Sequence, residues 1–251
     1  MPLADIILVT LAAFGAGILN TIAGGGTFLT FPALVFTGVP PVIANATSAV
    51  AVFPGYLGGA FGFRKEIARF SRRELVSHIL ITLAGGLVGS LLLLVSSNEA
   101  FSLIVPFLLL GATLVFLFGK EISNWAARHS RSGSGLQTVS LFFACVYGGY
   151  FNGGLGIVLL AIFALWGMID LHQMNGLKNG LSFVLSAISV VIFAVGGLVL
   201  WYQAVIMMIA AIIGGYVGAP IARALPRTVI RAIVALIGFT MSAVFFWQNI
   251  V

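Results

Sequence analysis

The chain is dominated by apolar runs of roughly 20 residues, the length that crosses the hydrocarbon core of a bilayer as a helix. Hydrophobic residues make up 61% of the sequence and charged residues only 7%. Soluble domains carry about 25% charged residues, so this chain cannot form a water-facing surface of ordinary composition. The sequence therefore predicts an all-α integral membrane protein whose main partner is the lipid bilayer.

The basic residues are grouped, and their grouping predicts the topology. All but one of the twelve Lys and Arg residues lie in three clusters between apolar runs. The clusters are Arg64, Lys65, Arg69, Arg72 and Arg73, then Lys120, Arg128 and Arg131, then Arg223, Arg227 and Arg231. Basic residues concentrate in cytoplasmic loops, so the net charge of +6 indicates orientation in a membrane and not binding to nucleic acid. We expect residues 64–74, 119–135 and 222–231 to be cytoplasmic, and loop 198–202 and both termini to be periplasmic.

Glycine clusters at residues 23–26 and 148–156 interrupt two of the apolar stretches. Non-helical backbone persists inside a bilayer only where protein or a water-filled cavity satisfies its polar groups. If each interrupted stretch crossed once, the chain would have eight spans, and the third basic cluster would face away from the other two. If each stretch turns back to the side it entered, all three clusters face one side. The sequence leaves open whether such hairpins are re-entrant or two short crossings.

The two halves of the chain share motifs in the same order. Residues 17–20 match residues 149–152, Asn45 matches Asn175, and the glycine run at 85–89 matches the run at 214–218. Chance matching among many glycines is the alternative explanation. If three spans follow each hairpin, an odd number of crossings separates the two hairpins. The second half then enters the membrane from the opposite side and is inverted relative to the first. We therefore predict two inverted repeats, each a glycine-broken helical hairpin plus three transmembrane helices. The predicted domains are a first membrane repeat at 1–120, a cytoplasmic linker at 121–135 and a second membrane repeat at 136–251.

The glycine breaks supply the first set of candidate substrate-binding residues. A break exposes backbone N–H groups and a helix N-terminus, both suited to an anion, and asparagine amides can donate further hydrogen bonds. The set is Asn20, Gly24, Gly25, Gly26 and Thr27 in the first half, with Asn152, Gly153, Gly154 and Gly156 in the second. The alternative is that these glycines only allow close helix packing. We expect that purely structural role for the runs at 85–89 and 214–218.

A polar stripe supplies the second set. It comprises Asn45, Thr47 and Ser48 in the first half, and Asn175, Lys178 and Asn179 in the second, where it continues at helical spacing through Ser182, Ser186 and Ser189. Interhelical hydrogen bonding is the alternative for the hydroxyls. Lys178 is the one basic residue outside the three clusters, and no acid lies near it in sequence except Asp170. An unpaired buried cation favours an anionic ligand, although a lysine near a helix end can also extend to the interface.

The acidic residues exclude several functions. All six fall at segment ends or in loops, so no carboxylate is placed to form a metal-cation pathway or a deep proton relay. We expect no metal and no cofactor. Walker, HExxH and GxSxG motifs are absent from the sequence, and nothing indicates an enzyme.

A set of motifs then resembles one known family. The motifs are GILNTIAGGG at 17–26, FPAL at 31–34, ANATS at 44–48 and FPG at 53–55, with GYFNGGLG at 149–156 and MNGLKN at 174–179. Over nearly the whole chain they resemble the sulfite exporter TauE/SafE family. The resemblance implies a secondary transporter that moves a small anion, a sulfite-like oxyanion or an organosulfonate, across the bacterial inner membrane by alternating access. It leaves the exact substrate, the direction, the coupling ion and any homo-oligomeric assembly open.

Two other functions fit parts of the same pattern. A passive anion channel could use the same residues, but its flux would not saturate or show counterflow. A membrane scaffold with no transported substrate is the third hypothesis, and paired asparagine-glycine breaks argue against it because a scaffold has no use for unwound backbone at depth.

Overall fold

The computed structural model describes residues 1–22, 25–128, 134–224 and 227–250, which are helical nearly throughout. In chain order the helices are α1 (Leu3–Ile22), α2 (Thr27–Phe36), α3 (Pro41–Gly62), α4 (Arg64–Ile67), α5 (Arg72–Val95), α6 (Asn98–Arg128), α7 (Ser134–Tyr150), α8 (Leu155–Leu165), α9 (Leu171–Val195), α10 (Trp201–Ala224) and α11 (Arg227–Ile250).

Five of the described helices are long and apolar enough to cross a membrane, as a multi-pass membrane protein requires. These spans are 3–20, 41–62, 72–95, 98–115 and 171–195. Helices α2 and α8 have only 10 and 11 residues. At 1.5 Å per residue they cover about half of a hydrocarbon core that is about 30 Å thick. Each half of the chain therefore begins with a helix, a break and a half-length helix, as the sequence predicts.

Local sequence explains where several helices begin. Pro41 occupies the first turn of α3, where its missing N–H costs nothing. Ser71 and Glu74 form a capping box at the start of α5. Helix α6 continues to Arg128, so the predicted linker at 121–135 is helical over its first part. The short helix α4 was not predicted from the sequence.

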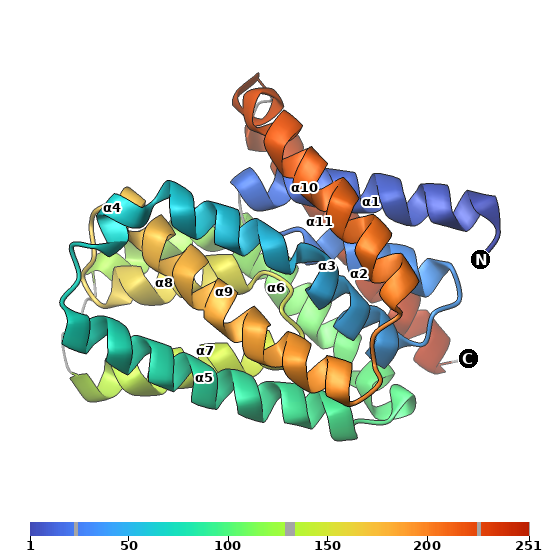
Figure 1. Ribbon diagram of the computed structural model, residues 1–251, viewed down its shortest axis with the longest axis horizontal. Helices are drawn as coiled ribbons and strands as arrows, with labels where there is room; N and C mark the ends of the chain where they lie inside the picture. Colours follow the sequence, from blue (N-terminus) through green and yellow to red (C-terminus); the bar gives the residue numbers. More distant parts are fainter. Residues whose placement is uncertain (23–24, 129–133, 225–226, 251) are drawn as a thin grey trace.

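The helices of the two halves are interleaved (Figure 1). Helix α7 packs against α5, and the corresponding helix of the first half, α1, packs against α10. Helices α3 and α9 pack against each other, as do α6 and α11. Each long helix of a hairpin is therefore held by a helix from the other half.

The glycine runs make these contacts close. A Cβ added at Gly85 would lie 2.6 Å from the carbonyl oxygen of Phe142 on α7, and one added at Gly214 would collide with the carbonyl of Phe14 on α1. A larger side chain at either position would force the helices apart. The structural role predicted for both runs is confirmed at these residues.

The two hairpins open toward opposite ends of the molecule (Figure 1). Both termini, the α2–α3 connection and the α9–α10 connection lie at one end. Helix α4 and the α8–α9 connection lie at the other. Helices α3 and α9 run between these ends in opposite directions, side by side, and so place one continuous interface through the middle of the fold.

Candidate functional site

The first break is held by Asn20 in the last turn of α1. Its Oδ1 accepts a hydrogen bond from the backbone N–H of Gly26 at 2.8 Å. The backbone angles of Gly26 are right-handed, so any residue could adopt them. The glycine is needed for space, since an added Cβ would lie 2.9 Å from the carbonyl oxygen of Ala16. Gly25 and Thr27 are buried beside it, and Gly24 lies outside the described residues.

The second break is built differently. Asn152 has φ 63° and Gly154 has φ 72°, both in the left-handed region that costs least for glycine and asparagine. The Tyr147 hydroxyl donates to the carbonyl of Gly153 and fixes the turn. Asn20 lies within a helix, whereas Asn152 follows one, so the two asparagines do not occupy equivalent conformations. Gly156 is buried in the first turn of α8.

The breaks leave fewer free backbone donors than the sequence suggested. The N–H of Phe28 donates to the carbonyl of Gly25 at 3.1 Å, and that of Leu155 donates to the carbonyl of Asn152 at 3.3 Å. The carbonyl of Gly154 accepts from the N–H groups of Ile157 and Val158. Backbone N–H groups that close the turns in this way do not face a substrate.

On α3, two of the candidate hydroxyls serve packing. Thr47 Oγ1 accepts from the N–H of Leu200 at 3.1 Å, just before α10 begins. Ser48 shares a hydrogen bond of 2.6 Å with Thr30 on α2. The interhelical alternative therefore describes Thr47 and Ser48 in this structure.

Asn45 behaves differently from its two neighbours on α3. Its Nδ2 donates to the carbonyl of Tyr150, the last residue of α7, at 2.9 Å. Its Oδ1 is buried and has no hydrogen-bond partner. Asn45 thus ties the first repeat to the second break and still offers a free polar atom.

Lys178 is buried on α9, with 5% of its surface exposed. Its Nζ donates to Asn175 Oδ1 at 3.1 Å, and Asn175 Nδ2 donates back to the carbonyl of Leu171. Asp170, the acid nearest in sequence, instead pairs with Arg69 at 3.2 Å at the surface. Within the described part of the chain, Lys178 has no acidic partner. The ammonium group is therefore an uncompensated cation inside the fold.

Unpartnered polar atoms continue along the same face of α9. Ser182 and Ser186 follow Lys178 at successive turns, each 1% exposed, and neither hydroxyl has a hydrogen-bond partner. Ser189, the next residue of the stripe, accepts from Ser90 on α5 at 2.7 Å. Buried polar atoms are nearly always paired, so two such hydroxyls in sequence indicate a place for water or a ligand.

The second break and helix α9 both approach α3. Asn152 is buried, its Oδ1 has no partner, and its side chain approaches Tyr56 on α3. Opposite α9, Phe53 stacks on Phe183 at 5.0 Å. A Cβ added at Gly59 would lie 2.7 Å from Cγ of Asn179. Of the candidates, Asn152 and Asn179 approach α3, and Lys178 lies next to Asn179 in sequence, on a neighbouring face of α9.

The first break reaches the same helix. A Cβ added at Gly55 on α3 would lie 3.9 Å from Nδ2 of Asn20. Gly55 directly precedes Tyr56, the residue that Asn152 approaches. The ring of Phe31 on α2 contacts that of Phe151 at 5.7 Å. Both breaks therefore meet near the middle of α3.

Helix α4 covers the lysine end of this interface. A Cβ added at Gly176 would lie 3.1 Å from Cβ of Phe63 and 3.2 Å from Cγ1 of Ile67. Asp170 caps α9 at the same end, and the backbone N–H groups of Gln173 and His172, with the Arg69 guanidinium, hold the pKa of its carboxyl below the usual range. This end of the interface is closed by packing and by an ion pair.

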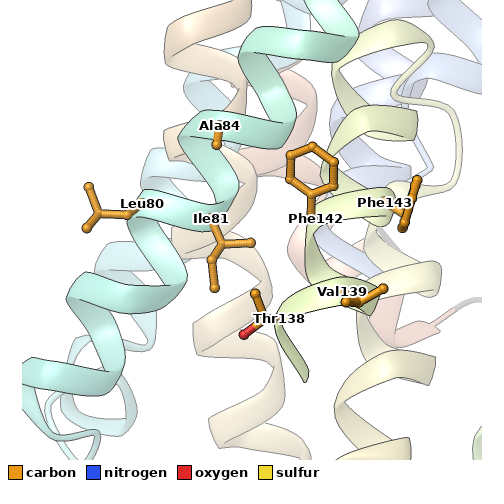
Figure 2. Close-up of a pocket in the computed structure, with 7 residues that line it drawn as sticks. All are labelled: Leu80, Ile81, Ala84, Thr138, Val139, Phe142 and Phe143. Carbon is orange, nitrogen blue, oxygen red and sulfur yellow. The ribbon is translucent and has the colours of Figure 1, made fainter. Parts of the chain in front are cut away.

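Two apolar grooves lie away from this interface. The first, with a volume of about 350 Å³, lies between α5 and α7 (Figure 2). The second, of about 420 Å³, lies between α6, α7 and α8. Neither is lined by a candidate site residue, and both are lined almost entirely by apolar side chains.

Two features escaped the sequence analysis. Tyr56 and Tyr147, which contact the second break, carried no periodic or motif pattern that would have singled them out. His78, which no sequence pattern singles out, is half-buried and stacks on Trp166 with ring centroids 5.2 Å apart. That contact joins α5 to the end of α8, and the sequence gives no indication of it.

Comparison with known proteins identifies the family of the chain. The Sulfite exporter TauE/SafE family matches residues 9–245. The chain belongs to this family. It is similar to a probable membrane transporter protein of Haemophilus influenzae, with 29% identity over 92% of this chain and 90% of that protein.

Two further relatives carry similar names. Probable membrane transporter protein ORF9 of Sinorhizobium sp is 26% identical over 92% of this chain and 88% of its own length. Probable membrane transporter protein YfcA of Escherichia coli K12 is 26% identical over 91% of this chain and 84% of its own length. No solved structure shows significant similarity to the chain. The protein is a multi-pass member of a family of membrane transporters.

Proposed function

We propose that this protein is a secondary transporter that moves a small anion, of the sulfur oxyanion or organosulfonate class, across the bacterial inner membrane by alternating access. The observation that carries the proposal is Lys178, which is buried without an acid in the described part of the chain. Along its helix face lie Ser182 and Ser186, whose hydroxyls are free to donate. A cation followed by unpaired donors is the arrangement that a buried anion requires.

The helix arrangement supports alternating access. Hairpins α1–α2 and α7–α8 open to opposite ends, and α1 and α7 make equivalent contacts with α10 and α5. These contacts are those expected of two inverted repeats, in which one repeat moves against the other around a central site. The α3–α9 interface, where both breaks meet, is the proposed location of that site.

The proposed binding residues divide into two groups. The residues proposed to contact the anion are Lys178, Ser182, Ser186, Asn152, Asn179 and Asn45. Asn20 and the glycines of the two breaks shape the hairpins, and Thr47 and Ser48 bind neighbouring helices.

The test is uptake into liposomes with the purified protein, screened with sulfite, thiosulfate, sulfate, small sulfonates and simple carboxylates. Saturable uptake of at least one sulfur oxyanion is expected. A flux that never saturates would indicate a passive channel, and uptake of none of these anions would refute the proposal.

Substitution of the two asparagines locates the site. Asn152→Gly keeps the left-handed backbone and removes the amide, so it should fold normally and lose transport. Asn20→Leu removes the acceptor for the N–H of Gly26, so it should lower stability as well. Wild-type transport by Asn152→Gly would remove the second break from the site.

A further inference from the structure

The single charge buried on α9 restricts which anions can bind. Among the residues whose burial the structure describes, Lys178 is the only buried charged group. The other buried polar groups proposed for the site, on Ser182 and Ser186 of α9 and on Asn152 of the second break, are neutral. The site therefore contains a single positive charge surrounded by uncharged hydrogen-bonding groups.

The ion pair at the start of α9 adds no net charge to the site. Arg69 and Asp170, at the α4 end, are 61% and 40% exposed and neutralise each other. Phe63 and Ile67 pack between that surface and α9 at Gly176. Because Arg69 and Asp170 are exposed and opposite in charge, water screening leaves them little influence on a substrate beside Lys178.

A single buried cation can neutralise a single negative charge. Hydroxyl and amide groups stabilise the oxygens of an oxyanion, but they do not cancel a second charge, and an uncompensated buried charge is costly. Resting on the transport function proposed above, we infer that the site selects monovalent sulfur oxyanions, namely hydrogensulfite and alkanesulfonates, over divalent ones such as sulfate and fully deprotonated sulfite. Sulfite would then enter the site in its protonated, singly charged form.

Competition against labelled sulfite in proteoliposomes tests this selectivity with the wild-type protein. Methanesulfonate and sulfate have similar sulfur–oxygen geometry and differ in charge. Methanesulfonate should compete at a concentration at least about tenfold lower than sulfate, a ratio equivalent to about 1.4 kcal/mol. Sulfate that competes as well as methanesulfonate, or better, would overturn the inference and leave anion transport intact. If neither anion competes and sulfite itself is not taken up, the transport function fails as well.

The pH dependence gives an independent test. As the pH is raised across neutrality, hydrogensulfite is converted to the divalent form, so uptake of total sulfite should fall. Methanesulfonate keeps its single charge over this range, and its uptake reports any loss of charge from Lys178. Lys178→Arg remains charged throughout, so in that variant the fall for sulfite should persist while methanesulfonate uptake stays level. Sulfite uptake that rises with pH in Lys178→Arg would contradict selection of the monovalent form.

Discussion

Replacing Lys178 by methionine tests whether this lysine binds the substrate or only anchors its helix at the membrane interface. Methionine has a similar length and no charge, so it fills the same space on α9. The hydrogen bond from Nζ to Asn175 Oδ1, at 3.1 Å, is lost with the charge. Because the lysine has no acid partner in the described chain, no opposite charge is left unpaired by the substitution.

The magnitude follows from the loss of one charge-assisted hydrogen bond to the anion. Such bonds contribute about 1.5–3 kcal/mol, so anion affinity should fall roughly 10- to 150-fold. Stability should not fall, because an uncompensated buried charge is itself unfavourable. Lys178→Arg keeps the charge on a larger, planar group and should retain part of the binding.

The assay measures anion affinity and the thermal unfolding midpoint of the same purified variants. Lys65→Met, which removes an exposed charge on α4, is the matched control and should leave both quantities unchanged. If Lys178→Met transports at the wild-type rate with unchanged affinity, then Lys178 is an interface anchor, and asparagine and serine groups alone hold the anion.

Three further predictions concern packing and topology. Gly89→Ala should lower the free energy of unfolding by about 1–3 kcal/mol, because the new Cβ would meet the backbone of α7. Gly111→Ala, whose Cβ faces open space on α6, is the control and should be neutral. Thermal unfolding in detergent compares the two variants. Gly59→Ala should impair transport, because its Cβ would lie 2.7 Å from Cγ of Asn179 on α9. Gly58→Ala, whose Cβ would have nothing within 4 Å, should transport normally. Equal transport rates for the two variants would count against the site. Cysteines introduced in loop 198–202 should react with impermeant reagent from the periplasm, and labelling from the cytoplasm would refute the proposed orientation.

The sequence predicted the parts of the fold that depend on local pattern. Apolar run length gave the long helices, and glycine clusters located both breaks. The helical spacing of Lys178, Ser182 and Ser186 placed them on one face, which is buried in the structure. These features need only the geometry of a helix and the polarity of the bilayer.

The remaining features depend on contacts between distant segments. Asn20 and Asn152 match in sequence, yet one caps a break from within a helix and the other forms part of a turn. Thr47 is bound to Leu200, which lies in the other half of the chain. Helix α4 has only four residues, too few to show any periodicity. Such roles follow from which helices meet, and a single sequence does not specify that directly.

Counterflow of sulfite tests the central claim of anion transport most directly. Proteoliposomes containing the purified protein are loaded with unlabelled sulfite and diluted into a trace of labelled sulfite. An alternating-access carrier exchanges the two, so the label should accumulate transiently inside above its equilibrium level, and Lys178→Met should abolish that overshoot. Labelled sulfite that only equilibrates, without overshoot and without saturation, would indicate a passive channel and contradict carrier-mediated transport.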